Sequence, residues 1–311
     1  MKEDISVLIL GASLGSYAAC RCFYTEYGIR PFVLDRALPP LFRTAKCARG
    51  IPSASFDIAK PSLCLHILEN VKESLGKRVL LLPATADYAT FLREWEEDLS
   101  LHFILPFHLS PSLPCFKQRE EAPFGFLVAL LDEEGEGSFC YAEAPVLLPS
   151  GKPAFWRTSA LLPSLLPYKE ALQGCKASGI FTFPLWKTDE GFDIGKPSCD
   201  LSSFPFFALA ADISPAEFLL FRFVLCIPFS APEVPSDGLY RLAPFPWLLS
   251  LCKDKRVKKD IRLLHRKGWE IGLLDAKKES RFPKSARARR EAFREYAFPV
   301  DKSAVFQEIQ S

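Results

Sequence analysis

The stretch VLILGASLGSYAACR, residues 7–21, places a serine between two glycines directly after an apolar run. The spacing Gly11-Ala12-Ser13-Leu14-Gly15 matches the G-x-S-x-G turn that presents a nucleophilic serine in α/β-hydrolases. The same order of apolar strand, glycine turn and helix also opens nucleotide-binding domains, where the turn cradles phosphate. A third interpretation is a tight turn that only lets the helix pack on a sheet. These residues therefore allow three functions, and the rest of the chain must decide between them.

A serine nucleophile needs a histidine base, an acid and an oxyanion hole that other strands position. Only ten residues precede Gly11, and the four histidines, at 66, 102, 108 and 265, belong to no recognisable motif. We therefore expect that Ser13 is no nucleophile and assign no catalytic residue. Its hydroxyl is expected to accept backbone N–H groups at the start of the helix.

The nucleotide interpretation gains from Asp35, which ends the next apolar run, because an acid at that point can bind a ribose hydroxyl. The candidate cofactor-binding residues are therefore Gly11, Ser13, Gly15 and Asp35. The loop G-A-S-L-G-S nevertheless departs from G-x-G-x-x-G, since Ser13 and Ser16 replace the second and third glycines. A nucleotide-binding oxidoreductase with NAD or FAD remains an alternative function.

The ten cysteines form no metal or disulfide pattern. The closest pair is Cys20-Arg-Cys22, and no C-x-x-C or Cys/His set has zinc spacing. MKEDISVLIL carries acids before a short apolar run, unlike a signal peptide. We therefore expect buried reduced thiols, no metal site and a cytoplasmic protein.

The most apolar region, FLLFRFVLCIPF at 218–229, is shorter than a membrane span and contains an arginine. Ser214 and Pro215 supply the cap and first position of a helix, so the region is expected to form a buried helix that ends at Pro228. We accordingly expect no membrane partner.

The apolar pattern divides the chain into three parts. Residues 1–110 alternate strands and helices and indicate a parallel, Rossmann-like domain, whose first helix should end at Gly28. Residues 111–235 carry proline-punctuated strands typical of an antiparallel sheet. Residues 236–311 form a basic C-terminal helical region. The predicted fold class is therefore α/β, with a Rossmann-like domain followed by an α+β domain and a basic helical tail.

The C-terminal region has an excess of positive charge, with 17 Lys/Arg against 8 Asp/Glu between residues 253 and 302. Such an excess permits an acidic partner. Val257, Ile261 and Leu264, however, fall on one helical face, which indicates an ordinary amphipathic helix with a solvated basic face. No aromatic stacking array accompanies the charge, and we expect no nucleic-acid partner.

Several stretches resemble the ATP-grasp carboxylate-amine ligases, in the branch similar to D-aspartate ligase. VLILGASLGSYAACRCFYTEYGIRPFVLDR and RVLLLPATADYATFLREWEEDLSLHFILPF resemble its N-terminal domain, called the pre-ATP-grasp domain. FCYAEAPVLLPSG resembles part of its central sheet, and LHRKGWEIGLLDAKKESRFPKSARARREAFREY resembles its basic C-terminal tail. The resemblance implies a Rossmann-like domain joined to an ATP-grasp-type sheet, and ATP with Mg²⁺ as ligands.

The departures from that family are as informative as the matches. After Phe107 the family inserts a small subdomain that clamps ATP, and the segment here is too short to build one. Pro184 stands near the place of the family's first metal-binding acid. Asp193 is left as a single carboxylate, and Lys196-Pro197-Ser198 replaces the residues that would hold magnesium and phosphate. Two Mg²⁺ ions on a triphosphate need several oxygen ligands, so the resemblance implies a truncated, degenerate homologue.

The sequence thus predicts a catalytically silent accessory subunit, either a hetero- or a homo-oligomer, with an intact ATP-grasp ligase as candidate partner. No cofactor is expected. The alternative is an active ATP-dependent carboxylate-amine ligase with unusual site residues, which would use ATP and Mg²⁺. FTFPLW (181–186) and SSFPFF (202–207) are expected to form an exposed apolar surface that a partner covers. The alternative is that these rings fill the space left by the nucleotide and close the core.

Overall fold

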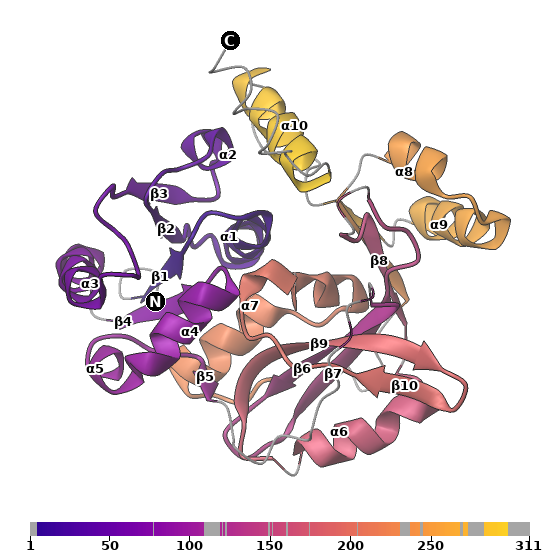
Figure 1. Cartoon of the computed structure of the whole chain (residues 1–311), viewed down its shortest axis with the longest axis horizontal. Coiled ribbons are helices and arrows are strands. Elements are labelled where there is room, and N and C mark those ends of the chain that lie inside the picture. Colours follow the sequence, from indigo (N-terminus) through magenta and orange to yellow (C-terminus); the bar gives the residue numbers. More distant parts are fainter. Residues whose placement is uncertain are drawn as a thin grey trace.

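The computed structural model describes residues 5–76, 78–108, 119, 121, 123–148, 150, 152–159, 161–173, 175–203, 205–230, 237–242, 245–267, 270–272 and 283–297. These residues form two β-sheets with helices packed around them, so the chain is a mixed α/β protein, as the sequence predicts (Figure 1). Among them, no helix combines the length and apolar character that crossing a bilayer requires.

The first sheet is parallel. It contains β1 (Ile5–Leu10), β2 (Phe32–Asp35), β3 (Arg49–Pro52) and β4 (Arg78–Pro83) in the order β3-β2-β1-β4. Residues 7–10 of β1 are completely inaccessible to solvent. A strand covered on both faces needs apolar residues at every position, which explains the continuous run VLIL. The strand, helix and strand predicted for residues 5–35 are confirmed.

Five helices accompany this sheet: α1 (Leu14–Tyr27), α2 (Pro40–Thr44), α3 (Pro61–Leu75), α4 (Ala86–Glu94) and α5 (Glu96–Ser100). Successive side chains of β1 point to opposite faces. Val7 and Ile9 pack with residues of α1, whereas Leu8 and Leu10 pack with residues of α3 and α4. Helix α1 therefore lies on one face of the sheet, and α3 and α4 lie on the other.

The second sheet is larger and mostly antiparallel. Its strands follow the order β10-β9-β6-β7-β8-β11-β12, and β5 pairs with β9. The strands are β5 (Phe107–His108), β6 (Gly125–Leu131), β7 (Gly137–Glu143), β8 (Phe155–Ser159), β9 (Ser178–Thr188), β10 (Gly191–Ile194), β11 (Gly238–Arg241) and β12 (Glu270–Gly272). The segment after Phe107, where we expect no clamping subdomain, lies largely outside the described residues.

Strands β11 and β12 come from the C-terminal region, for which we expected helices alone. β11 pairs antiparallel with β8 and parallel with β12, so this region completes the second sheet. All four residues of β11 are buried. Such a short, fully buried strand carries no alternating pattern, and the amphipathic helices around it dominate the sequence signal.

The remaining helical segments cover the second sheet. The outer face carries η1 (Pro163–Leu165) and α6 (Leu166–Gln173). The C-terminal part contributes α8 (Phe245–Leu251), α9 (Lys255–Lys267) and α10 (Pro283–Ala297). Val257, Ile261 and Leu264 of α9 face the core as predicted, and Arg157 Nη1 on β8 donates to Asp260 Oδ2 at 2.6 Å.

The helix expected at 218–229 has a different form. Ser214 caps it as predicted, because its Oγ accepts the backbone N–H of Glu217. The segment then runs as α7 (Pro215–Phe218) and a π-helical turn η4 (Leu219–Leu225), and it ends at Cys226 with a left-handed φ of 55°. The chain therefore leaves the helix before Pro228. The sequence of Leu219–Leu225 carries no recognisable signal for the wider π turn that these residues form.

The expectation of an exposed aromatic surface is wrong. Phe181, Phe183, Phe206 and Phe207 are completely buried, and Trp186 is 7% exposed. Phe181 and Phe183 pack under α6, whereas Phe206 and Phe207 lie in η3 (Pro205–Ala211), which follows η2 (Leu201–Ser203) between the two sheets. The rings fill a closed core, which is the other outcome that the sequence allowed.

One hydrophobic cluster joins both sheets. It includes Val7 of β1, Tyr17 of α1, Phe207 of η3 and Trp156 of β8. Figure 1 shows α1 and α7 lying between the two sheets, with α6 on the far side of the larger sheet. The residues of both sheets therefore share a continuous interior in which α1 is the central element.

Candidate functional site

The candidate site lies at the carboxyl ends of the parallel strands. The glycine turn follows β1, Asp35 ends β2, and Thr85 follows β4. The chain passes from β1 to β2 on one side of β1, and β4 lies on its other side. Ligands of open α/β sheets bind where the strand order reverses in this way. This position favours the end of β1 as a binding site.

The glycine turn uses its backbone donors within the protein. Gly11 has a φ of +98°, and its N–H donates to the Leu34 carbonyl at 2.8 Å. The Ala12 N–H donates to Asp35 Oδ2 at 2.7 Å, and the Ser13 N–H donates to Ser16 Oγ at 3.3 Å. Three consecutive N–H groups that could bind phosphate thus already have internal acceptors.

Ser13 caps α1. Its Oγ accepts the Ser16 N–H at 3.1 Å, and the Ser16 Oγ donates to the Gly11 carbonyl at 2.8 Å. The two serines form a reciprocal capping box. The cap predicted for the Ser13 hydroxyl is confirmed, and so is the left-handed end of α1 at Gly28, where φ is 66°. Ser16 lies in the first turn of α1 and is completely buried, and its hydrogen bonds explain why a polar residue stands there.

Asp35 binds the turn. Its Oδ2 accepts from Ala12, as described, and its Oδ1 accepts the Arg36 N–H at 2.7 Å. The carboxylate therefore joins the end of β2 to the turn after β1. This contact brings Asp35 together with Gly11 and Ser13, as the sequence predicts, although its oxygen atoms serve the fold in this arrangement.

Gly11 and Gly15 are both required by close packing. A Cβ at Gly15 would lie 1.8 Å from the backbone oxygen of Leu201 in η2. A Cβ at Gly11 would lie 2.6 Å from Cε2 of Tyr88 and 3.0 Å from Cβ of Ala84. The spacing that resembles a catalytic motif is therefore explained by the approach of α1 and the turn to neighbouring segments.

Two adjoining pockets open beside this turn. The larger has a volume of about 540 Å³, and the smaller has a volume of about 210 Å³. Both are lined by Lys152 and Tyr296. The larger pocket is also lined by Thr85, Pro123, Phe126, Leu147, Pro153, Trp156, Ser202 and Ser203, and the smaller by Ala12, Ser13, Leu14, Pro39, Leu41, Phe42 and Ala292. We call the two together the cleft.

Lys152 and Tyr296 contact each other in the cleft. The Lys152 ammonium lies 4.8 Å from the centre of the Tyr296 ring. The Tyr296 hydroxyl donates to the Pro153 carbonyl at 3.3 Å. Burial raises the pKa of the Tyr296 phenol, so the hydroxyl keeps its proton and its donor role. α10 thereby contributes a wall of the cleft.

Sequence reasoning did not find the residues of the larger pocket. Lys152 comes from the connection between β7 and β8 and Ser202 comes from η2, and neither segment carries a motif. Tyr296 comes from the C-terminal region, whose basic residues we expected to form a solvated face. A partial signal exists in DLSS, because Asp200 accepts the Ser202 N–H at 2.6 Å in a capping pattern typical of Asp-x-Ser. The other residues meet only through tertiary structure.

The positions at which the resemblance implies metal ligands lie on β9, β10 and the following loop. Asp193 is buried on β10 and forms an ion pair with Arg119. Pro184 on β9 supplies no side-chain ligand. Lys196 is exposed, and Ser198 Oγ donates to Asp200 Oδ2 at 2.7 Å. The family's acidic set is thus represented by one carboxylate that a guanidinium already neutralises.

These residues do not fit MgATP. Two magnesium ions bridging a triphosphate need several free carboxylate or amide oxygens. Within the described ranges, no three His, Cys, Asp or Glu side chains cluster in a way that could hold a metal ion. The described residues that line the cleft supply a lysine, hydroxyls and apolar side chains, and none of them is a carboxylate. Its chemistry suits a small organic anion better than a metal-bound nucleotide.

Comparisons with known proteins find the fold but no sequence relative. No family model matches the chain, and no curated protein matches its sequence. Solved structures match the architecture. Kluyveromyces lactis urea carboxylase superposes with a TM-score of 0.51 at 14% identity, over 77% of this chain and 23% of that chain. The biotin carboxylase subunit of pyruvate carboxylase gives a TM-score of 0.51 at 11% identity, over 77% and 74% of the two chains.

Kluyveromyces lactis urea amidolyase gives a TM-score of 0.50 at 13% identity, over 77% of this chain and 16% of that chain. The chain therefore shares the architecture of these enzymes over about three quarters of its length. It spans less than a quarter of the two large Kluyveromyces enzymes. At these identities the likeness concerns architecture alone, and the ligase resemblance of the sequence stretches agrees with it.

Proposed function

We propose that this protein is a catalytically silent relative of the ATP-grasp carboxylate-amine ligases, from the branch similar to D-aspartate ligase, and acts as an accessory protein. The ion pair between Asp193 and Arg119 carries the proposal. Asp193 is the carboxylate left where the resemblance implies magnesium ligands. A carboxylate bound to arginine is a poor ligand for Mg²⁺, because the two cations compete for the same oxygens and repel each other.

The glycine turn supports the same proposal. A phosphate group at this turn would have to displace the Asp35 carboxylate from the Ala12 N–H. The incoming phosphate and Asp35 both carry negative charge, so they would also repel each other. Both the metal site and the phosphate site of a nucleotide-binding ligase are thus engaged by groups of the chain itself.

The accessory role is the function that the proposed loss of phosphoryl-transfer chemistry leaves to this protein. The retained fold and the cleft beside Lys152 support a binding role, which is the activity we propose. We propose an intact ATP-grasp ligase as the partner. The buried aromatic segments do not supply the contact surface, and the proposal rests on the retained fold.

Calorimetric titration of the whole protein with MgATP, together with an ATP hydrolysis assay, tests whether the protein is catalytically silent. An active ATP-grasp ligase measured in the same buffer is the positive control. We expect no heat of binding and no hydrolysis above the rate in buffer. Binding with a dissociation constant well below about 1 mM, or steady turnover, would refute the silent assignment and favour an active ligase.

Light scattering of the purified chain, alone and with an intact ATP-grasp ligase encoded beside it, tests the partner. We expect a mass that equals the sum of the two chains. If the chain stays a monomer and elutes separately from every such ligase, the accessory role is wrong, whatever the MgATP titration shows.

A further inference from the structure

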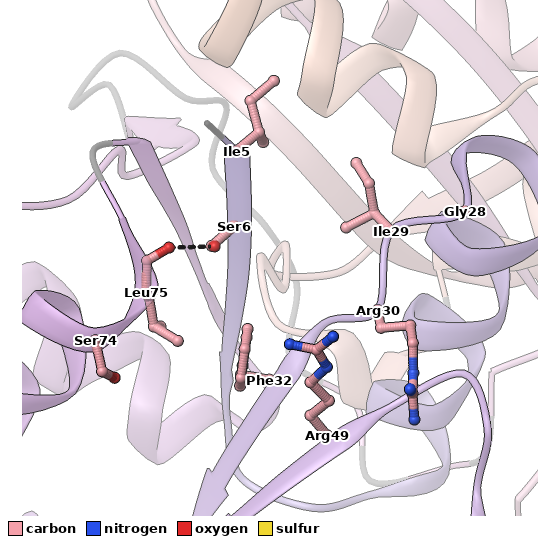
Figure 2. A pocket seen from close by; sticks show the side chains of 9 residues that line it. All are labelled: Ile5, Ser6, Gly28, Ile29, Arg30, Phe32, Arg49, Ser74 and Leu75. Carbon is pink, nitrogen blue, oxygen red and sulfur yellow. Dashed lines mark hydrogen bonds between the residues drawn. The ribbon is translucent and has the colours of Figure 1, made fainter. Parts of the chain in front are cut away.

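A second pocket lies at the opposite edge of the parallel sheet, at the amino ends of its strands. It has a volume of about 290 Å³ and is separate from the cleft. Its wall comes from the starts of β1, β2 and β3, the loop after α1 and the end of α3. The lining residues are Ile5, Ser6, Gly28, Ile29, Arg30, Phe32, Arg49, Ser74 and Leu75 (Figure 2).

Arg30 and Arg49 are the charged residues among the described residues that line this pocket. Figure 2 shows Arg49 rising from β3 toward Phe32, and Arg30 extending from the loop that follows α1. Both side chains are exposed to solvent. Where the structure describes the lining, it contains no acidic residue. The pocket is therefore positively charged and accessible from outside.

Each arginine is held by an uncharged group. The Arg49 guanidinium lies 5.2 Å from the centre of the Phe32 ring, and β3 pairs Arg49 directly with Phe32. An Arg30 Nη2 donates to the Ala48 carbonyl at 3.4 Å, a long hydrogen bond. Neither arginine takes part in an ion pair with a carboxylate in the described part of the chain. Both positive charges are thus positioned without being neutralised.

The neighbouring hydroxyls do not compensate this charge. Ser6 Oγ donates to the Leu75 carbonyl at 2.5 Å, and Ser74 Oγ donates to the Val71 carbonyl at 2.6 Å. Both hydroxyl protons are therefore used in hydrogen bonds to backbone carbonyls. Among the described side chains of the pocket, the guanidinium N–H groups remain as donors for a ligand, and they form a planar fork suited to two oxygens of one anion.

We propose that this pocket is a binding site for a small phosphate anion, either free phosphate or a phosphate monoester. Arg30 and Arg49 would each donate to phosphate oxygens, and the stacking of Arg49 on Phe32 fixes the direction of its fork. Two guanidiniums in one pocket repel each other until a dianion neutralises them, so a dianion is favoured over chloride or a monocarboxylate.

The ends of α1 and α3 lie beside the pocket, and helix C-termini are partly negative. The partial negative charge of these helix ends weakens the attraction for an anion. It also stabilises nearby arginines, which is an alternative explanation for their position. The charge of the two guanidiniums exceeds that of the helix ends, each about half an elementary charge. Binding of phosphate is therefore expected to be weak but measurable, with a dissociation constant on the order of 1 mM.

The experiment is a calorimetric titration of the whole protein with inorganic phosphate and, separately, with glycerol 3-phosphate, at constant ionic strength. We expect Arg30→Gln and Arg49→Gln each to weaken binding by about tenfold, the effect of losing a hydrogen bond to a charged group. Arg43→Gln is the matched control, because it removes one exposed positive charge from α2 and should leave binding unchanged. Tighter binding of the monoester would identify a phosphorylated metabolite as the ligand, and equal binding would identify free phosphate.

A second measurement needs no variant. Phenylglyoxal modification of arginines, followed by mass spectrometry, should become slower at Arg30 and Arg49 when phosphate is added, and stay unchanged at Arg43. The proposal is overturned if neither anion binds at about 10 mM, if the three variants bind alike, or if phosphate protects all three arginines equally. The cleft and the MgATP result play no part in this test, so either proposal can fail without the other.

Discussion

Substitution of Gly15 by alanine provides the sharpest test of how α1 is positioned. Gly15 stands in the first turn of α1, where alanine would ordinarily be the better helix former by about 0.5–1 kcal/mol. Local propensity alone therefore predicts that Gly15→Ala stabilises the protein. The packing of this residue predicts the opposite sign.

The magnitude follows from the contact with η2. The new Cβ would lie 1.8 Å from the Leu201 backbone oxygen and 2.6 Å from its carbonyl carbon. Ordinary contact for a Cβ begins near 3.4 Å. The helix and η2 would have to separate by more than an ångström through a region where Leu201 and Tyr17 are buried. Overpacking costs about 1–3 kcal/mol, and a contact this close to backbone falls at the top of that range, so we expect a net loss of about 2 kcal/mol after the gain in propensity.

Urea unfolding followed by circular dichroism measures this loss. Gly50→Ala is the matched control, because its Cβ would lie 2.3 Å from the Leu38 Cδ1, which is the end of a flexible side chain. Rotation of Leu38 should limit that loss to less than about 1 kcal/mol. A Gly15→Ala protein as stable as the wild type, or less affected than Gly50→Ala, would refute the close approach of α1 to η2.

Three further predictions concern the same turn. Gly11→Val should cost more than about 1 kcal/mol, because it combines a φ of +98° with a contact to Tyr88, and an unchanged melting temperature would count against this. Ser13 should resist fluorophosphonate probes, whereas Ser13→Ala should lose about 1 kcal/mol through the cap; labelling of Ser13 would revive the hydrolase interpretation. Burial, with a smaller effect from the charge of Asp35, raises the pKa of Tyr88 to about 12. The unfolded phenol ionises near pH 10, so stability should fall as pH rises from about 10 to 12, and Tyr88→Phe should flatten that fall in unfolding measured across alkaline pH.

The sequence predicts the first sheet well because its signals are local. The run from Val7 to Leu10, the cap at Ser13 and the left-handed glycine at position 28 each specify an element within a few residues. The amphipathic face of α9 is found in the same way. The helix after Ser214 begins as predicted, but its π turn depends on how Leu219–Leu225 fits the core, which no local spacing reveals.

The cleft could not be predicted, because its residues meet only in the folded chain. Thr85, Lys152 and Tyr296 are far apart in sequence and share no motif. The exposed surface predicted for the aromatic segments was wrong for a related reason. A phenylalanine-rich sequence is equally suited to a contact surface and to the interior between two sheets. Only the folded structure shows that Phe207 stacks on Trp156, with ring centres 5.7 Å apart.

The position of α1 between the two sheets determines the kinetics of ligand binding to the cleft. Its buried residues belong to the same hydrophobic cluster as those of β1 and β8, so the two walls of the cleft are joined through a solid interior. A hinge motion that opened or closed the cleft would have to break that packing. The cleft is therefore preformed, and a ligand should associate in a single concentration-dependent step without a slower closing phase. For the same reason heat should melt both sheets in one cooperative transition rather than sheet by sheet.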